Sequence, residues 1–169
     1  MRRAIAAALF LYLAAVTWIA CSTHAQEQPA QPLEFSHRIH VSQFKMDCQY
    51  CHVYARRGPV AGLPSVQRCV QCHFAIANDR PEIVRLMQFW ERREPIPWVR
   101  IHKLPEHAQF DHQRHVLGGV ACATCHGEVS QMEAAVQVAP LTMGWCLTCH
   151  DGQPRDGKLA SRDCVICHY

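Results

Sequence analysis

One continuous hydrophobic run stands out near the N-terminus. Residues 4–20 contain a single polar side chain, Thr17, and two arginines precede them. A run of this length is typical of a secretory signal or of a short membrane helix, and Cys21 directly after it also allows attachment of a lipid. Each of these fates exports the chain from the cytoplasm. We therefore expect residues 1–25 to be a signal peptide or an N-terminal membrane anchor, followed by a linker over 26–34.

A second hydrophobic pattern, near the middle of the chain, has the period of an α-helix. Its apolar residues follow the spacing i, i+3, i+4 and i+7, at Ile83, Leu86, Met87 and Trp90. This spacing places them on one helical face. Pro81 suits a first helical turn and Pro95 ends the segment, so we predict an amphipathic helix over 80–93. We interpret its apolar stripe as a core or cofactor-packing surface.

Cysteine and histidine recur together in the pattern Cys-x-x-Cys-His. Its five copies begin at Cys48, Cys69, Cys122, Cys146 and Cys164. In this pattern the two thiols form thioethers with haem, and the histidine becomes the proximal iron ligand. Paired cysteines also occur in zinc sites and disulfides, but neither explains a histidine after every pair. With 12 histidines in 169 residues, five such coincidences have a chance on the order of one in a million.

The motifs therefore predict five covalently bound c-type haems. The thioether-forming cysteines are Cys48, Cys51, Cys69, Cys72, Cys122, Cys125, Cys146, Cys149, Cys164 and Cys167. The proximal iron ligands are His52, His73, His126, His150 and His168. The 144 residues beyond Ala25 amount to about 29 per haem, too few to bury a large apolar core. We predict a mostly α-helical fold with long loops and little strand, a multihaem cytochrome c of class III or c7 type whose haems form the core.

A repeated hexapeptide divides the chain into modules. Residues 35–40 and 110–115 both read Phe-x-His-x-x-His; each precedes one haem motif, and a second motif follows. Repeats this short cannot bury a face alone, so the modules should pack through their haems. The predicted parts are a first dihaem module, a connecting helix and extended segment, a second dihaem module and a fifth-haem segment, at 35–77, 78–109, 110–151 and 152–169.

The number of histidines left to bind the second axial position of each iron distinguishes an electron carrier from an enzyme. Seven of the 12 histidines are not proximal ligands, enough for bis-histidine ligation of every iron, which favours electron transfer over substrate binding. The predicted distal ligands are His37, His40, His102, His112 and His115. We interpret His107, in a polar setting, as a surface or propionate-binding residue; His107 and Met143 are the alternatives to His102 as the fifth distal ligand. The sequence contains no recognisable catalytic constellation, so we expect no catalytic site in this chain.

The haem motifs and their surroundings resemble a known family. The Phe-x-His-x-x-His repeat resembles class III multihaem cytochromes c. Residues 97–105, 122–127 and 140–146 resemble the pentahaem subunit of bacterial alternative complex III, a quinol-oxidising respiratory assembly, and the likeness covers most of 35–168. It implies an electron-transfer subunit on the periplasmic side of the inner membrane, anchored by its N-terminal segment or by its partners, and it supports His102 as a distal ligand.

The resemblance also implies partners. They would be an iron–sulfur subunit resembling molybdopterin oxidoreductases, membrane subunits of the polysulfide-reductase type and a monohaem cytochrome c. The alternatives are a soluble periplasmic electron shuttle, a membrane-anchored multihaem quinol dehydrogenase and an oxyanion reductase. Nucleic acid is not expected as a partner, because no basic patch is interleaved with aromatic residues and the haem propionates offset the formal charge of +3.

The motif count makes a direct prediction about mass. The intact mass of the mature protein should exceed that of the polypeptide by five haems, whereas Cys149→Ala should impair one attachment and leave four. Four or fewer haems on the fully matured unmodified chain would contradict the motif count.

Overall fold

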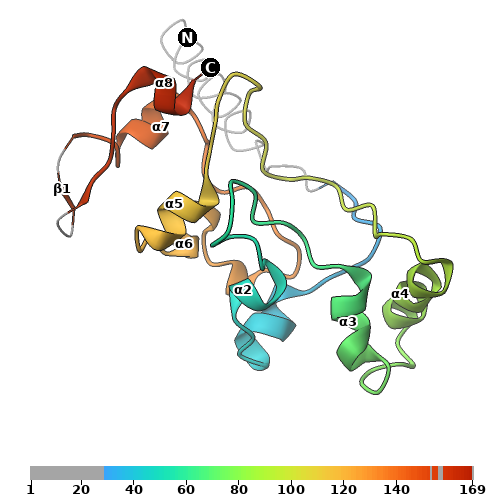
Figure 1. Cartoon of the computed structure of the whole chain (residues 1–169). Helices are drawn as coiled ribbons and strands as arrows, with labels where there is room; N and C mark the ends of the chain where they lie inside the picture. The colour runs from blue at the N-terminus through green and yellow to red at the C-terminus, as the bar shows by residue number, and fades with distance from the viewer. Residues whose placement is uncertain (1–28, 153, 156–157, 169) are drawn as a thin grey trace, which may run out of the picture.

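The computed structural model describes residues 29–152, 154–155 and 158–168 as short helices joined by long loops (Figure 1). The α-helices are α2 (Cys48–Cys51), α3 (Val66–His73), α4 (Pro81–Arg92), α5 (His112–Leu117), α6 (Cys122–His126), α7 (Met143–Leu147) and α8 (Cys164–Cys167). The remaining elements are the π-helix η1 (Arg38–Gln43), the 3-10 helix η2 (Val129–Gln131), and the strands β1 (Pro154–Arg155) and β2 (Lys158–Leu159).

Strand content is small. The two-residue strands β1 and β2 pair antiparallel, with Pro154 opposite Leu159 and Arg155 opposite Lys158. The predicted fold, mostly α-helical with long loops and little strand, is confirmed. Within the described ranges no helix has both the length and the hydrophobicity needed to cross a membrane. The hydrophobic run 4–20 lies outside those ranges.

Side-chain caps start several of the short helices. Asp47 accepts a hydrogen bond from the Gln49 amide at the start of α2, and Asp163 caps α8 in the same way. The Thr142 hydroxyl accepts from the Trp145 amide at the start of α7. Such a cap satisfies an amide that has no partner within the helix. Helices of four or five residues depend on caps because they contain few hydrogen bonds of their own.

Helix α4 bears out the predicted amphipathic helix over 80–93. It begins with Pro81 in its first turn, and Arg93 ends it in the left-handed conformation, with φ of 56°. Leu86, from the predicted stripe, lies in a small core with residues of α3 and the adjoining loops. The members of this core are Leu33, Val66, Val70, Leu86 and Ile96.

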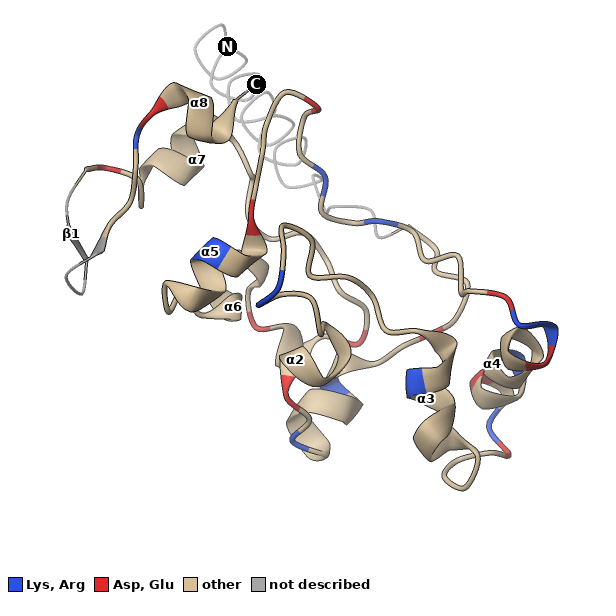
Figure 2. Cartoon of the chain, in the orientation of Figure 1, with Lys and Arg blue, Asp and Glu red and all other residues tan. Residues whose placement is uncertain are grey.

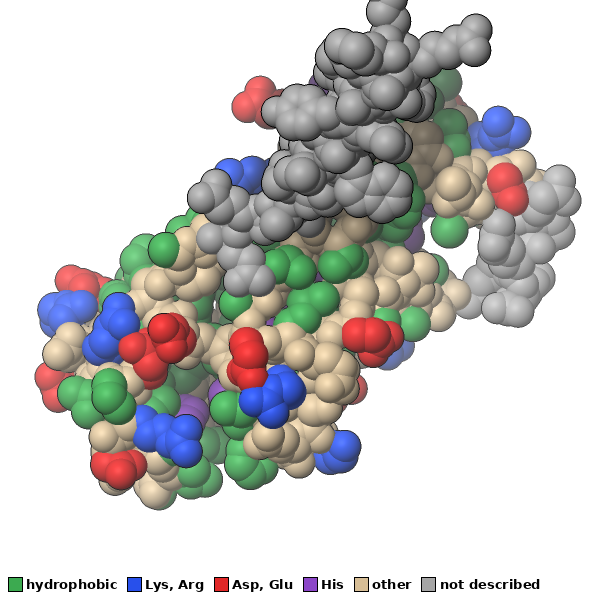
Figure 3. All heavy atoms as spheres, turned by 180° about the vertical axis from the view of Figure 1, so that it is seen from behind, with side chains coloured by type: hydrophobic (Ala, Val, Ile, Leu, Met, Phe, Trp, Pro, Cys, Tyr) green, Lys and Arg blue, Asp and Glu red, His purple; other side chains and the backbone are tan. Residues whose placement is uncertain are grey.

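This protein core is small for the size of the chain. Seven hydrophobic residues are buried among the described residues, and none of the polar or charged ones is. Large apolar side chains such as Phe44, Phe74 and Val165 are more than half exposed, and hydrophobic side chains cover much of the face shown in Figure 3. The polypeptide alone therefore leaves apolar surface open around the haem motifs, as a fold built around bound haem would.

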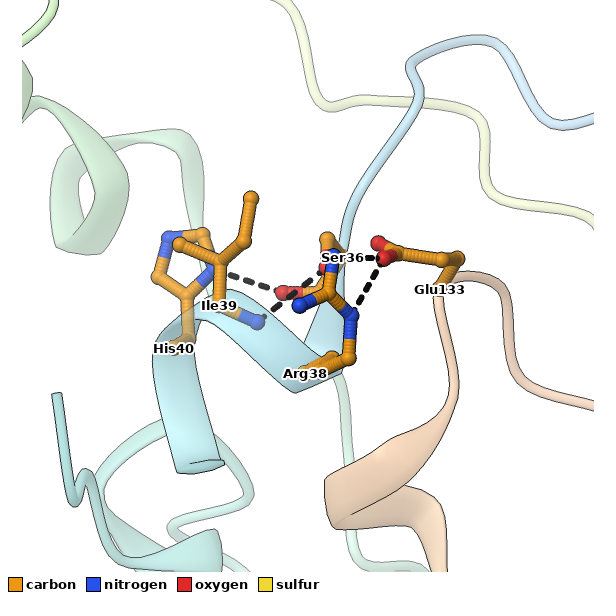
Figure 4. A network of polar contacts seen from close by, with 5 residues as sticks. All are labelled: Ser36, Arg38, Ile39, His40 and Glu133. Atoms are coloured by element: carbon orange, nitrogen blue, oxygen red, sulfur yellow. Dashed lines mark hydrogen bonds and ion pairs between the residues drawn. The ribbon is translucent and has the colours of Figure 1, made fainter. Parts of the chain in front are cut away.

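The two repeated modules contact each other through η1 and η2. The Arg38 amide donates to the Met132 carbonyl at 2.9 Å, and the Arg38 guanidinium pairs with Glu133. Hydrogen bonds from Ser36 and Arg38 hold the pKa of Glu133 below its usual value. Figure 4 shows Ser36 at the centre of this network, where its hydroxyl also accepts from the Ile39 amide.

Two further contacts tie distant segments together. The His112 amide donates to the Pro59 carbonyl, which joins the start of α5 to the loop after the first motif. The Gln109 amide donates to the Cys167 carbonyl at 2.8 Å, and Ala108 bridges His168 in an antiparallel arrangement. The fifth haem motif therefore lies against the connecting segment.

The small core makes a prediction about stability. Leu86 is 4% exposed and Val84, on the same helix, is 48% exposed. Leu86→Ala should lower the free energy of unfolding by about 2–5 kcal/mol because it leaves a cavity, whereas Val84→Ala should change it by less than about 0.5 kcal/mol. Denaturant titration of the holoprotein measures both, and equal effects would show that this cluster does not stabilise the fold.

Candidate haem sites

The repeated hexapeptide has the same side-chain geometry in both modules. Phe35 stacks on His40 with ring centroids 4.4 Å apart and meets His37 edge-on at 4.9 Å. Phe110 stacks on His115 at 4.4 Å and likewise meets the edge of His112, at 4.8 Å. Each phenylalanine therefore fixes two imidazoles that point in different directions. This arrangement suits two histidines that serve two different haems.

Histidine rings lie opposite four of the five proximal histidines at similar distances. The ring centroids are 6.1, 6.3, 5.9 and 5.7 Å apart in the pairs His40–His73, His112–His126, His115–His150 and His107–His168. Two imidazoles that bind one iron through bonds of roughly 2 Å have centroids roughly 6 Å apart. The spacing therefore fits bis-histidine ligation without rearrangement of the backbone.

His37 is the histidine placed toward the first motif. Burial, together with the nearby His52 and His40, lowers its pKa to about 4. In the part of the chain that the structure describes, its Nδ1 is the buried side-chain nitrogen that lacks a hydrogen-bond partner. A buried polar atom without a partner is costly. The lowered pKa keeps the imidazole neutral, and a neutral imidazole in this position fits a role as a ligand.

A cavity beside the first motif could hold part of a haem. Its volume is about 400 Å³, and Cys51, Tyr54, Val66, Arg68 and Trp98 contribute to its lining. This volume falls in the range of roughly 300–1,000 Å³ that is common for cofactor pockets. The guanidinium of Arg68 at its wall provides a positive charge of the kind that pairs with carboxylates such as haem propionates.

The proximal histidines all use Nδ1 for a hydrogen bond. In four of them the partner is a backbone carbonyl: Gly62 for His52 at 2.7 Å, Ile76 for His73 at 3.0 Å, Ser161 for His150 at 2.7 Å and His107 for His168 at 3.1 Å. In the fifth, His126, the partner is Nε2 of His102 at 3.2 Å. The hydrogen bond fixes the orientation of each ring, and Nε2 is the nitrogen that would bind a haem iron.

His102 and His107 differ from their predicted roles in where they lie. His102 was predicted as a distal ligand, but its ring meets His126 edge-on at 4.5 Å and contacts Nδ1, the atom that faces away from the iron position. His107 was interpreted as a surface or propionate-binding residue and as an alternative fifth ligand, and its ring lies nearly parallel to that of His168, at 20°. The contacts favour His107 as the distal ligand of the fifth haem. Its signal was not visible in the sequence because the two residues are far apart along the chain.

The motif thiols lie close to one another between motifs. Burial raises the pKa of Cys48, and the neighbouring Cys122 thiol raises it further. Burial and the Cys51 thiol have the same effect on the pKa of Cys69. The ten motif cysteines are all free thiols, so each remains available for a thioether bond.

The fourth and fifth motifs continue these contacts. Burial raises the pKa of Cys125, with further contributions from the thiols of Cys149 and Cys146 in the fourth motif. Burial likewise raises the pKa of Cys146, and Cys167 of the fifth motif adds to the effect. The five motifs therefore form one row in the order second, first, third, fourth and fifth. Figure 1 shows the corresponding order of helices, from α3 through α2 and α6 to α7 and α8.

The fourth motif extends past the end of its helix. Helix α7 ends at Leu147, so Cys149 and His150 lie beyond it. The Thr148 hydroxyl donates to the Trp145 carbonyl, and the amides of Cys149 and His150 both donate to the Cys146 carbonyl. The chain thus turns tightly after the helix and still brings the motif histidine to the His115 ring.

Comparison with known proteins agrees with this arrangement. The family model described as cytochrome c7 and related cytochrome c matches residues 108–169. The chain is 27% identical to the menaquinone reductase multiheme cytochrome c subunit of Nitratidesulfovibrio vulgaris, over 89% of this chain and 82% of that protein. Together with the helical fold and the motifs, these similarities define the chain as a multihaem c-type cytochrome, an electron-transport protein with covalently bound c-type haem.

The pairing of His107 with His168 makes a prediction that ligand exchange tests. His107→Met should leave all haems attached, raise the reduction potential of one and add a near-infrared His/Met band, because a thioether favours reduced iron. The control is Met143→Leu, since Met143 is 62% exposed; it should leave the spectrum unchanged. If the unmodified protein has a near-infrared His/Met band and Met143→Leu lacks it, Met143 is a ligand instead.

Proposed function

We propose that this chain is the pentahaem electron-relay subunit of a membrane-bound, quinone-linked respiratory complex on the periplasmic side of the inner membrane. The observation that carries the proposal is the pairing of each proximal histidine with a second imidazole. Four pairs lie 5.7–6.3 Å apart between ring centroids, and His37 is placed toward His52. When bound, the haems supply one-electron redox chemistry, and two protein ligands per iron leave no open position for a substrate.

In this proposal the chain's own residues hold and orient the haems. The ten motif cysteines attach them, the five motif histidines bind from one side, and distal histidines bind from the other. The proposed distal ligands, in motif order, are His37, His40, His112, His115 and His107. The backbone carbonyls at Nδ1 keep the proximal rings in one tautomer and one orientation. Fixed ligands require little rearrangement when the redox state changes.

The row of motifs gives the relay two ends. The second motif, on α3 beside α4, lies at one end, and the fifth motif, on α8, lies at the other (Figure 1). A donor and an acceptor that contact opposite ends need not meet. Figure 2 shows acidic and basic residues interspersed along the ribbon around α4, whereas α8 presents the exposed apolar side chains of Val165 and Ile166. The two ends therefore suit different partners.

Two lines support assignment to a quinone-linked complex. The related subunit from Nitratidesulfovibrio vulgaris is named as part of a menaquinone reductase, and residues 97–105, 122–127 and 140–146 resemble alternative complex III. Both support a multihaem subunit that works within a quinone-linked complex. We propose partners of that kind: an iron–sulfur or molybdopterin-like subunit and polysulfide-reductase-like membrane subunits, with a monohaem cytochrome c if the complex is alternative complex III. In this proposal the chain itself does not bind quinone.

Gentle detergent extraction tests this assignment. The haem-stained band should migrate with integral membrane proteins, and mass spectrometry should identify the partner classes named above; the presence of a monohaem cytochrome c distinguishes the two complexes. A high-salt wash before extraction is the control for loosely bound protein. Recovery of all haem-stained protein in the soluble periplasmic fraction, without a partner, would favour an electron shuttle and contradict the proposal.

A further inference from the structure

The contact between His102 and His126 differs from the other proximal contacts. Nε2 of His102 lies 3.2 Å from Nδ1 of His126. The two rings meet edge-on, at 77°. The ring of His126 is also nearly parallel to that of His112, with 10° between the planes and 6.3 Å between the centroids. His126 thus has two imidazole neighbours: a candidate distal ligand, and His102 at its Nδ1.

The chemistry of a ligating imidazole fixes the direction of this hydrogen bond. A neutral imidazole that binds iron through Nε2 carries its proton on Nδ1. The Nδ1–H of His126 is therefore the donor, and Nε2 of His102 is the acceptor. His102 must then carry its own proton on Nδ1, and the lone pair it offers to His126 is not available to an iron.

The backbone around His102 is held in place by polar contacts. The Arg100 guanidinium donates to the His102 carbonyl at 3.0 Å. Three residues before His102, Val99 exchanges two hydrogen bonds with the side chain of Gln31: the Val99 amide donates to Oε1 at 2.9 Å, and Nε2 donates to the Val99 carbonyl at 3.0 Å. The acceptor is therefore presented by an anchored segment.

We propose that His102 is a positioning residue that tunes the third haem through His126. A hydrogen bond from Nδ1–H makes the imidazole a stronger electron donor to its metal, which favours oxidised iron. An imidazole nitrogen is a more basic acceptor than the peptide carbonyls that serve the other four proximal histidines. The third haem should accordingly have a lower reduction potential than it would have without His102. The inference rests on the proposed function for the presence of a haem at this motif.

Two substitutions in the full-length holoprotein test the inference. His102→Leu removes the acceptor, whereas His102→Gln keeps an oxygen at a similar distance from the backbone. The Leu variant should retain five low-spin haems, while the one-electron equilibrium of a single haem shifts roughly tenfold toward the reduced form, or about 59 mV. The potential of this haem in the Gln variant should lie between those of the Leu variant and the unmodified protein, because an amide oxygen is a weaker acceptor than an imidazole. Val99→Ala is the control in the same segment and should change no potential.

The readouts are intact mass, the low-spin and high-spin signals in electron paramagnetic resonance, and a potentiometric titration. One high-spin haem in the Leu variant would overturn the inference and identify His102 as an iron ligand. Five low-spin haems with unchanged potentials would overturn it by showing that the contact has no effect. If the Leu variant does not mature, the Gln variant decides, since potentials equal to those of the unmodified protein would contradict the inference. A third motif without haem in the unmodified protein would overturn both this inference and the proposed function.

Discussion

The distance between two imidazoles across an iron is the constraint on which this fold depends. Ring centroids near 6 Å must be kept by a chain with seven buried hydrophobic residues among those described. The chain meets this requirement locally. Aspartate and threonine caps start short helices at three motifs, and a hydrogen bond at Nδ1 fixes each proximal ring. Precise placement therefore arises from polar contacts close to each motif, because little packing is available to supply it.

The repeated hexapeptide shows how few residues this placement needs. In each copy one phenylalanine contacts two histidines, and the second histidine of each pair also bonds the backbone carbonyl four residues earlier, at 2.8 Å. The first histidines differ: Nδ1 of His112 meets the Pro59 carbonyl, whereas that of His37 has no partner among the described residues. The contacts within the hexapeptide are therefore the same in both copies. The contacts that each copy makes with the rest of the molecule differ. Haems held by equivalent ligands can in this way have different surroundings.

The features that the sequence predicted are local ones. The fold class and the helix over 81–92 follow from spacing within a few residues, and the motifs are read directly. Three of the hexapeptide histidines, His40, His112 and His115, lie opposite motif histidines. His107 was only an alternative ligand, because its contact with His168 depends on the pairing of Ala108 with that residue across a large part of the chain. The place of His102 was missed for the same reason: segment 97–105 indicates a histidine near a haem, but only the tertiary contact shows which nitrogen it faces.

The choice of acceptor at Nδ1 decides how easily a haem can be tuned. A backbone carbonyl is set by the course of the chain, so its hydrogen bond cannot change without moving the loop that carries it. At His126 the acceptor is a side chain, and one substitution can strengthen, weaken or remove it while the backbone stays in place. The third motif is also the middle of the row, in contact with the first through Cys48 and Cys122 and with the fourth through Cys125. In the proposed relay, an adjustable acceptor at this position would affect transfer in both halves, whereas one at either end would affect exchange with a single partner.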